Sequence, residues 1–109
     1  MATKQKFSSF QELLTQSEVP LVVDFYATWC GPCQMMAKIL EQVNSEMQQR
    51  VKIVKIDTEK YPDLASQYQI YALPTLVIFK DGRPVDRVEG VVHAHQLVQR
   101  LNQITGSPV

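Results

Sequence analysis

The chain has 109 residues, of which 45% are hydrophobic and 20% charged, and its 11 basic and 11 acidic side chains leave no formal net charge. This length predicts one domain over residues 1–109, and the balanced charge argues against a nucleic-acid-binding protein. No apolar run approaches the ~20 residues that span a bilayer, and none follows the N-terminal lysines as in a secretory signal. We therefore expect a cytoplasmic monomer that associates with neither membranes nor nucleic acid.

The N-terminal part predicts a helix followed by a buried strand. Residues 3–7 give a weak signal for a short edge strand. Ser9 and Glu12 have the spacing of a capping box, and the apolar residues after them predict a helix at about 10–16. The run 21–27 is apolar on both alternating faces, which is typical of a central strand covered on both sides.

The stretch after the two cysteines predicts a long amphipathic helix. Apolar residues recur there at one-turn spacing from residue 34 to about 49. The same row, continued backwards, places Cys33 in the first turn and Cys30 at or just before the N-terminus. Pro32 suits a first turn, where its missing N–H leaves no hydrogen bond unmade.

The rest of the chain completes an alternating pattern. It predicts, in order, a strand at 51–57, a short helix from Pro62, a strand at 75–79, a turn at Asp81-Gly82, a strand at 85–88 and a helix over 97–104. Such an order predicts an α/β fold with a central mixed sheet of about four to five strands, flanked by about four helices on both faces.

Cys30 and Cys33, separated by Gly31 and Pro32 at a strand–helix junction, predict redox chemistry. The thiolate is the nucleophile in disulfide exchange, and the positive end of a helix favours an anion. We therefore expect a lowered pKa at Cys30, which would attack a substrate disulfide. Cys33 can then attack the mixed disulfide, and this step is fast because it is intramolecular.

Asp24 is an acid inside an otherwise apolar strand. Burial should raise its pKa, so that it could take the proton of Cys33, through a water molecule, as that sulfur becomes the attacking thiolate. The alternative is an acid at the sheet rim that pairs with Lys55 on the neighbouring strand. The two interpretations are compatible.

Two other roles for the cysteines need weighing. A structural disulfide would close only a tiny loop, and it would be unusual in a reducing compartment. Cys30, Cys33, His93 and His95 have the ligand count of a zinc site. The His-x-His spacing fits such a site poorly, and Gly-Pro between the cysteines suits a redox turn, so we expect no bound metal.

These motifs come in an order that resembles the thioredoxin family from about residue 10 to 101. The series is Trp29-Cys30-Gly31-Pro32-Cys33 after an apolar strand with an internal aspartate, Leu73-Pro74-Thr75 before the next strand, and then Gly90. The strand and the cysteine motif are particularly similar to y-type thioredoxins of cyanobacteria and chloroplasts. The resemblance implies the thioredoxin fold and a general protein disulfide reductase.

The resemblance also implies a role for each matching residue. Cys30 matches the nucleophile, Cys33 the resolving thiol, Asp24 the buried acid that relays a proton, and Lys55 the lysine that modulates it. Pro74 matches the cis-proline that faces the thiols, and Leu73 would pair with the extended chain of a substrate. The flat apolar patch where partner proteins dock is matched by Trp29, Gly31, Pro32, Leu73, Pro74, Gly90 and Val91.

The family's partners and location follow in the same way. The resemblance implies no bound cofactor and electrons from a thioredoxin reductase, either NADPH-linked or ferredoxin-linked. The targets would be proteins that contain disulfides, such as peroxiredoxins, and the role would be cellular redox homeostasis. The location would be the cytoplasm, or the plastid stroma if a transit peptide has been removed.

Some alternatives and departures stay open. A glutaredoxin-like or oxidase-like protein could share the fold, and the apolar patch alone would suit a non-catalytic binding or holdase domain. Lys38 stands where many thioredoxins have a helix-kinking proline, and Tyr26 replaces a frequent tryptophan. The first strand, at 3–7, is poorly marked.

Overall fold

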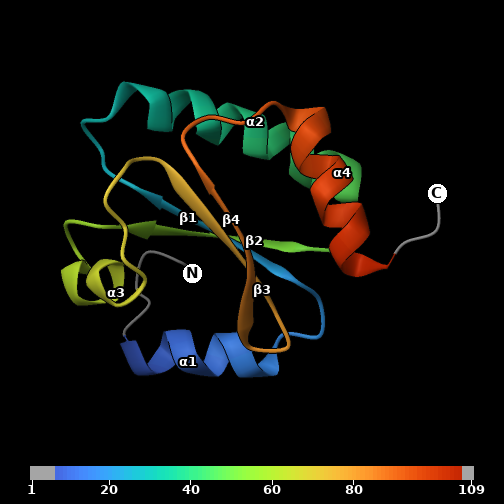
Figure 1. Cartoon of the computed structure of the whole chain (residues 1–109), viewed down its shortest axis with the longest axis horizontal. Coiled ribbons are helices and arrows are strands. Elements are labelled where there is room, and N and C mark those ends of the chain that lie inside the picture. Colours follow the sequence, from blue (N-terminus) through green and yellow to red (C-terminus); the bar gives the residue numbers. More distant parts are fainter. Residues whose placement is uncertain (1–6, 107–109) are drawn as a thin grey trace.

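The computed structural model describes residues 7–106, which form four helices and a four-stranded mixed sheet (Figure 1). In chain order the elements are α1 (Phe7–Gln16), β1 (Leu21–Tyr26), α2 (Gly31–Met47), β2 (Lys52–Asp57), α3 (Pro62–Gln67), β3 (Thr75–Lys80), β4 (Arg83–Glu89) and α4 (Ala94–Thr105). The predicted α/β fold with helices on both faces of a mixed sheet is confirmed.

The sheet has the strand order β2-β1-β3-β4. β1 runs parallel to β2 and antiparallel to β3, and β3 pairs antiparallel with β4. The last pair is joined by Asp81 and Gly82, with φ angles of 54° and 79°. Positive φ at both central residues matches the twist of a two-residue hairpin, which explains why this dipeptide predicted the turn.

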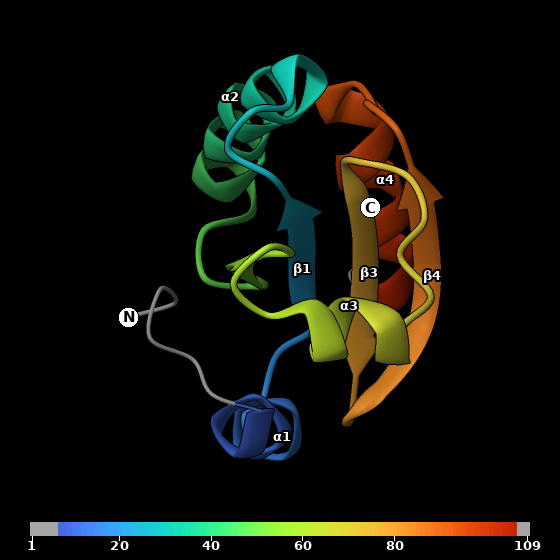
Figure 2. The same ribbon diagram turned by 90° about the vertical axis from the view of Figure 1, so that its left-hand side faces the viewer.

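The two faces of the sheet carry separate cores, each covered by a pair of helices (Figure 2). Side chains of α2 and α4 pack with Val22 on one face, and side chains of α1 and α3 pack with Val23 on the other. Successive residues of a strand face opposite sides of a sheet. Asp24 therefore shares the face of Val22 and points toward the α2 layer, which places its carboxyl on the same side as the cysteine helix.

Most predicted elements are found, and their bounds shift by one to three residues. α2 runs without interruption through Lys38, which is exposed, and it ends at Met47, where Gln48 takes a left-handed conformation with φ 46°. β4 is longer than the predicted 85–88. Among the described helices, none is both long enough and apolar enough to cross a membrane.

Two predictions at the N-terminus fare differently. α1 begins at Phe7, so Ser9 lies inside its first turn and the predicted capping box is wrong. Serine is tolerated in a first turn as well as at a cap, so the pattern with Glu12 does not locate the start of the helix. Of the predicted edge strand at 3–7, residues 3–6 lie outside the described residues, and Phe7 is helical.

Candidate active site

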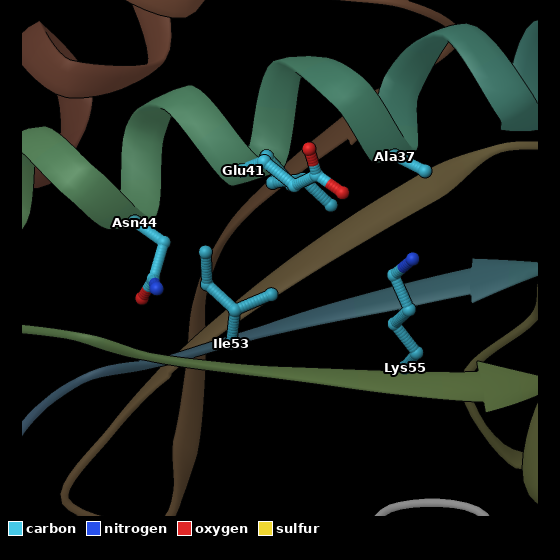
Figure 3. A pocket seen from close by; sticks show the side chains of 6 residues that line it. Ala37, Glu41, Asn44, Ile53 and Lys55 are labelled. Carbon is cyan, nitrogen blue, oxygen red and sulfur yellow. The ribbon is translucent and has the colours of Figure 1, made fainter.

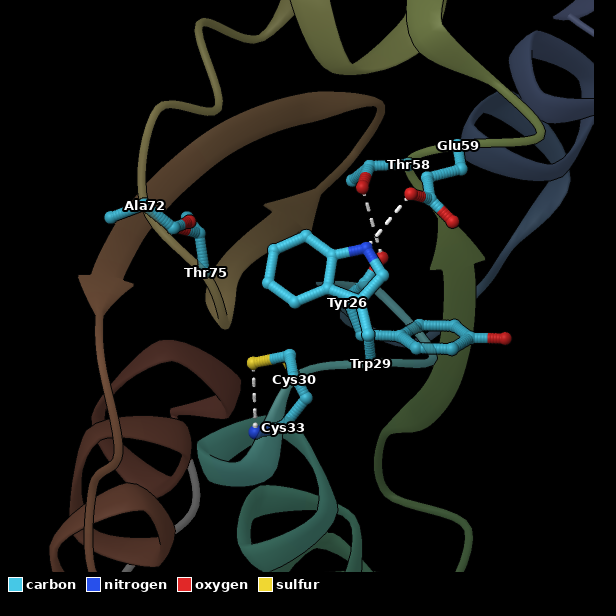
Figure 4. The surroundings of a disulfide bond; sticks show 8 residues. All are labelled: Tyr26, Trp29, Cys30, Cys33, Thr58, Glu59, Ala72 and Thr75. Carbon is cyan, nitrogen blue, oxygen red and sulfur yellow. Dashed lines mark hydrogen bonds between the residues drawn. A yellow bond between two sulfur atoms is a disulfide. The ribbon is translucent and has the colours of Figure 1, made fainter.

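The two cysteines lie at the start of α2, as predicted. They are joined by a disulfide, and their Cα atoms are 5.2 Å apart. Cys30 is the N-cap residue, and its Sγ accepts a hydrogen bond from the backbone N–H of Cys33 at 3.2 Å (Figure 4). Free N–H groups and the helix dipole both stabilise negative charge at this position. The local structure therefore favours a thiolate at Cys30.

Asp24 lies beneath the cysteine pair. It is 1% exposed, and within the described part of the chain its Oδ1 has no hydrogen-bond partner. Burial raises the pKa of Asp24 from 3.8 to about 6, and the nearby charge of Lys55 opposes that rise. Asp24 and Cys33 line one pocket of about 220 Å³, together with Tyr26 and Lys55. One water needs only ~10–15 Å³ of such space, so a water molecule fits in the pocket that both side chains line.

Lys55 lies opposite Asp24 in the register of β1 and β2. Its side chain is exposed, and among the described residues the two groups form no ion pair. Lys55 also lines a second pocket of about 180 Å³ between α2 and β2, and Figure 3 shows its side chain pointing toward Ala37 of the helix. The alternative of an acid at the sheet rim, paired with this lysine, is therefore not what the structure contains.

The segment before β3 passes next to the disulfide. Leu73 packs against the buried cluster of Ala27, Cys30 and Cys33. The Leu73–Pro74 peptide is cis, as the family resemblance implied. The Pro74 carbonyl accepts a hydrogen bond from the Gly90 N–H at 2.8 Å. This bond holds the two loops that the sequence marked as docking segments side by side.

Trp29 is held by contacts that sequence reasoning missed. Its indole Nε1–H donates to Glu59 Oε2 at 2.8 Å (Figure 4), and the Glu59 N–H in turn donates to Asp57 Oδ1 at 2.9 Å. Trp29 and Glu59 are 30 residues apart, and no local pattern marks such a pair. Glu59, which is itself bonded to Asp57 at the end of β2, thus orients the indole next to the cysteine motif.

The surface around the disulfide is only partly the predicted patch. Trp29 is 68% and Val91 38% exposed, and Gly31 and Pro32 are also on the surface. Pro74 is buried, so it contributes little area to this surface. Tyr71 was not predicted, although it is 85% exposed two residues before Leu73. An aromatic residue beside the Leu-Pro motif was the signal that could have found it.

The histidines lie at the start of α4. His93 is the N-cap residue of α4 and His95 lies in its first turn, and both side chains are exposed. In the part of the chain that the structure describes, no three His, Cys, Asp or Glu side chains are grouped so that they could hold a metal ion.

The site has two cysteines at the start of a helix and a buried acid that shares a pocket with the second cysteine. The segment before a cis-proline packs against the same cysteines. These features together define a thiol–disulfide oxidoreductase. Residues 2–103 match the family model described as thioredoxin. The chain belongs to the thioredoxin family, whose members are protein disulfide oxidoreductases. The predicted family and disulfide reductase activity are confirmed.

Individual relatives agree with this assignment. The chain is 62% identical over 101 residues to thioredoxin-like protein slr0233 of Synechocystis sp., covering 93% of this chain and 96% of that protein. It is 55% identical to thioredoxin Y1, chloroplastic, of Arabidopsis thaliana, over 92% of this chain and 58% of that protein's length. The crystal structure of chloroplastic thioredoxin z superposes with a TM-score of 0.85 at 41% identity, covering 94% of this chain and 93% of that one.

Proposed function

We propose that Cys30 is the attacking thiol and Cys33 the resolving thiol. The observation that supports these roles is the cap geometry, in which the Sγ of Cys30, and not that of Cys33, accepts a backbone N–H at the helix start. The Cys30 thiolate attacks one sulfur of the target disulfide and releases the other sulfur as a thiolate. The Cys33 thiolate then attacks the Cys30 sulfur and releases the second target thiolate. The target gains two electrons, and the enzyme ends with the Cys30–Cys33 disulfide.

Asp24 is the base that we propose for the second step. Cys33, and not Cys30, lines the pocket that contains the Asp24 carboxyl. With its pKa raised to about 6, ionised Asp24 is present at neutral pH and is a stronger base than an ordinary aspartate. It accepts the Cys33 proton through a water molecule in the pocket. Lys55 modulates this base, because its positive charge favours the carboxylate.

Targets dock, in this proposal, on the surface that surrounds the disulfide. The extended chain of a target lies along Leu73, where backbone hydrogen bonds can form, and its side chains contact Trp29 and Val91. Gly90 lies beside Pro74 through their shared hydrogen bond, so the two loops face the same target chain together. This use of exposed backbone follows the common mode of β-strand addition.

We base the proposed electron donor, targets and location on the similar proteins. The Arabidopsis thaliana and Oryza sativa relatives are named chloroplastic. We propose that this protein works in a plastid stroma or a cyanobacterial cytoplasm and receives electrons from a ferredoxin-linked or NADPH-linked thioredoxin reductase. Peroxiredoxins are proposed targets, because a similar solved structure, at 34% identity and a TM-score of 0.82, concerns thiol resolution in a yeast mitochondrial 1-Cys peroxiredoxin.

The reduction of insulin with dithiothreitol as electron donor tests the roles of the cysteines. Cys30→Ser should abolish turnover. Cys33→Ser should instead accumulate a mixed disulfide with the target, which is visible by mass spectrometry under non-reducing conditions. If Cys30→Ser retained reductase activity, or if the trapped adduct formed on Cys33 in a Cys30→Ser background at the same rate, the assignment would fail.

The same variants separate catalysis from the binding alternative. A domain that only binds or holds proteins should keep its partners in Cys30→Ser and should suppress aggregation of an unfolded client equally well. Insulin turnover with an NADPH-linked flavoprotein reductase, compared with a ferredoxin-linked reductase, then identifies the donor. Turnover with neither enzyme, in a protein active with dithiothreitol, would overturn the proposed electron supply.

A further inference from the structure

Arg87 of β4 makes a fork of hydrogen bonds that the disulfide chemistry does not explain. Its Nη1 donates to the Tyr68 carbonyl at 2.6 Å, and its Nη2 donates to the Gln69 carbonyl. Its Nε also lies 3.4 Å from the carboxylate of Glu89. One guanidinium thus joins the last strand to the end of α3, which is 18 to 19 residues earlier in the chain.

The two carbonyls lie where α3 ends. Tyr68 is the C-cap residue of α3, and Gln69 follows in a left-handed conformation with φ 56°. The last carbonyls of a helix have no partner within the helix, and they carry partial negative charge. The guanidinium satisfies both oxygens at once, so it fixes the direction in which the chain leaves α3.

That exit leads directly into the docking segment. Ile70, Tyr71 and Ala72 separate Gln69 from Leu73. The far end of this segment is tied by the bond from the Thr75 hydroxyl to the Ala72 carbonyl, at 2.6 Å, as well as by the Gly90–Pro74 bond. In the described structure, the near end is held by turns at the end of α3 and by the arginine fork.

Arg87 is also connected to the second docking loop. It lies opposite Val77 in the β3–β4 register, and two residues after it β4 ends at Glu89, immediately before Gly90. The strand that carries the fork therefore continues directly into the 90–91 loop. A shift of the arginine would move the start of one docking segment relative to the other.

We propose that Arg87 is a positioning residue that holds segment 70–74 and the 90–91 loop at a fixed separation across the disulfide. It touches no reacting atom. It sets the affinity for extended protein targets, because both segments must contact the target chain together. This inference rests on the docking surface proposed above.

Arg100 provides a matched control on the opposite face of the same strand. Its Nη1 lies 2.9 Å from both carboxylate oxygens of Asp86, the residue next to Arg87. This pair joins β4 to α4 and touches neither docking segment. Arg100→Gln therefore removes an arginine contact of β4 other than the fork, and Asp86 can keep the hydrogen bond that it accepts from the Arg87 N–H at 2.7 Å.

The test compares a protein target with a small disulfide. We expect Arg87→Gln to raise the KM for insulin by about 3- to 10-fold, within the range that coupled positions typically contribute. The kcat for insulin and the rate constant with 5,5′-dithiobis(2-nitrobenzoate) should stay within about twofold of the wild-type values, because the reacting sulfurs keep their surroundings. Arg87→Lys should recover part of the insulin KM, since lysine keeps the charge and can donate to these carbonyls but lacks the rigid planar fork of the guanidinium. Arg100→Gln should leave both substrates unchanged.

Several outcomes would overturn the inference. An Arg87→Gln variant with the wild-type KM for insulin would do so, as would an equal loss with both substrates or the same rise in KM in Arg100→Gln. If Arg87→Gln did not fold, the test would use Arg87→Lys and measure hydrogen exchange of the Ile70 and Gly90 amides. Unchanged exchange in the lysine variant would refute the proposal that Arg87 holds the two docking segments. Failure of the wild-type protein to reduce insulin would instead refute the proposed function, so the two failures are distinguishable.

Discussion

Asp24→Asn should stabilise the protein at neutral pH. The carboxyl is 1% exposed, and its Oδ1 has no partner among the described residues, so folding removes a charged oxygen from water with little return. The pKa rises from 3.8 to about 6, and at ~1.4 kcal/mol per pH unit this corresponds to about 3 kcal/mol of lost stability. Asparagine keeps the shape of the side chain and removes the charge.

The gain should depend on pH in a defined direction. Well below pH 3.8 the carboxyl is protonated in both the folded and the unfolded chain, and its charge costs nothing. Between 3.8 and about 6 the unfolded chain loses the proton first, so the stability of the wild-type protein falls as pH rises. Above the folded-state pKa the full penalty remains. The advantage of Asp24→Asn should therefore be about 0.5 kcal/mol at pH 4 and reach about 3 kcal/mol by pH 8.

Urea unfolding of the oxidised protein, at steps of half a pH unit from 4 to 8, measures this difference. Far-UV circular dichroism is the suitable probe, because Trp29 is 68% exposed and its emission reports folding poorly. Glu12→Gln, which neutralises an exposed carboxylate on α1, serves as control and should show no comparable rise. A flat difference across this range, or a variant less stable than wild type at pH 8, would refute the assignment of Asp24 as a buried, uncompensated acid.

Further outcomes follow from the same site. Asp24→Asn should slow insulin reduction at pH 7 by about 10- to 100-fold. We expect the wild-type rate to fall below about pH 6, as Asp24 becomes protonated, and the variant to lack this fall. Wild-type rates across this range would exclude the proton relay. Lys55→Met should move the midpoint of that fall to higher pH, because the lysine lowers the pKa of Asp24, and a downward shift would contradict this. In the reduced protein, iodoacetamide should alkylate Cys30 well before Cys33, whereas equal labelling would argue against a thiolate stabilised by the helix start. Glu59→Ala should change the fluorescence emission of the only tryptophan, because its indole N–H would lose its carboxylate partner. The substitution should cost at most about 1 kcal/mol of stability, because the pair is exposed. An unchanged spectrum would show that the bond does not persist in solution.

Local patterns were sufficient for the elements that carry the cysteines. The apolar faces of the 21–27 run and the one-turn spacing after Cys33 predicted β1 and α2, and the same spacing placed Cys30 at the helix start. The pattern failed at Ser9, because a first-turn serine and a capping serine are alike in sequence. The cis form of Leu73–Pro74 came from the family resemblance, since the local preference between cis and trans before proline is small.

The sequence by itself determined which residues are reactive and on which elements they lie, because helix periodicity, capping and strand alternation are interactions between near neighbours along the chain. Only the tertiary structure brought the Asp24 carboxyl into one pocket with Cys33, set Leu73 against the sulfurs and tied Trp29 to Glu59. The raised pKa of Asp24 depends on burial under α2, and the arginine fork depends on β4 lying beside the end of α3. Such contacts follow from how the helices pack on the sheet, and no spacing within a single segment encodes them.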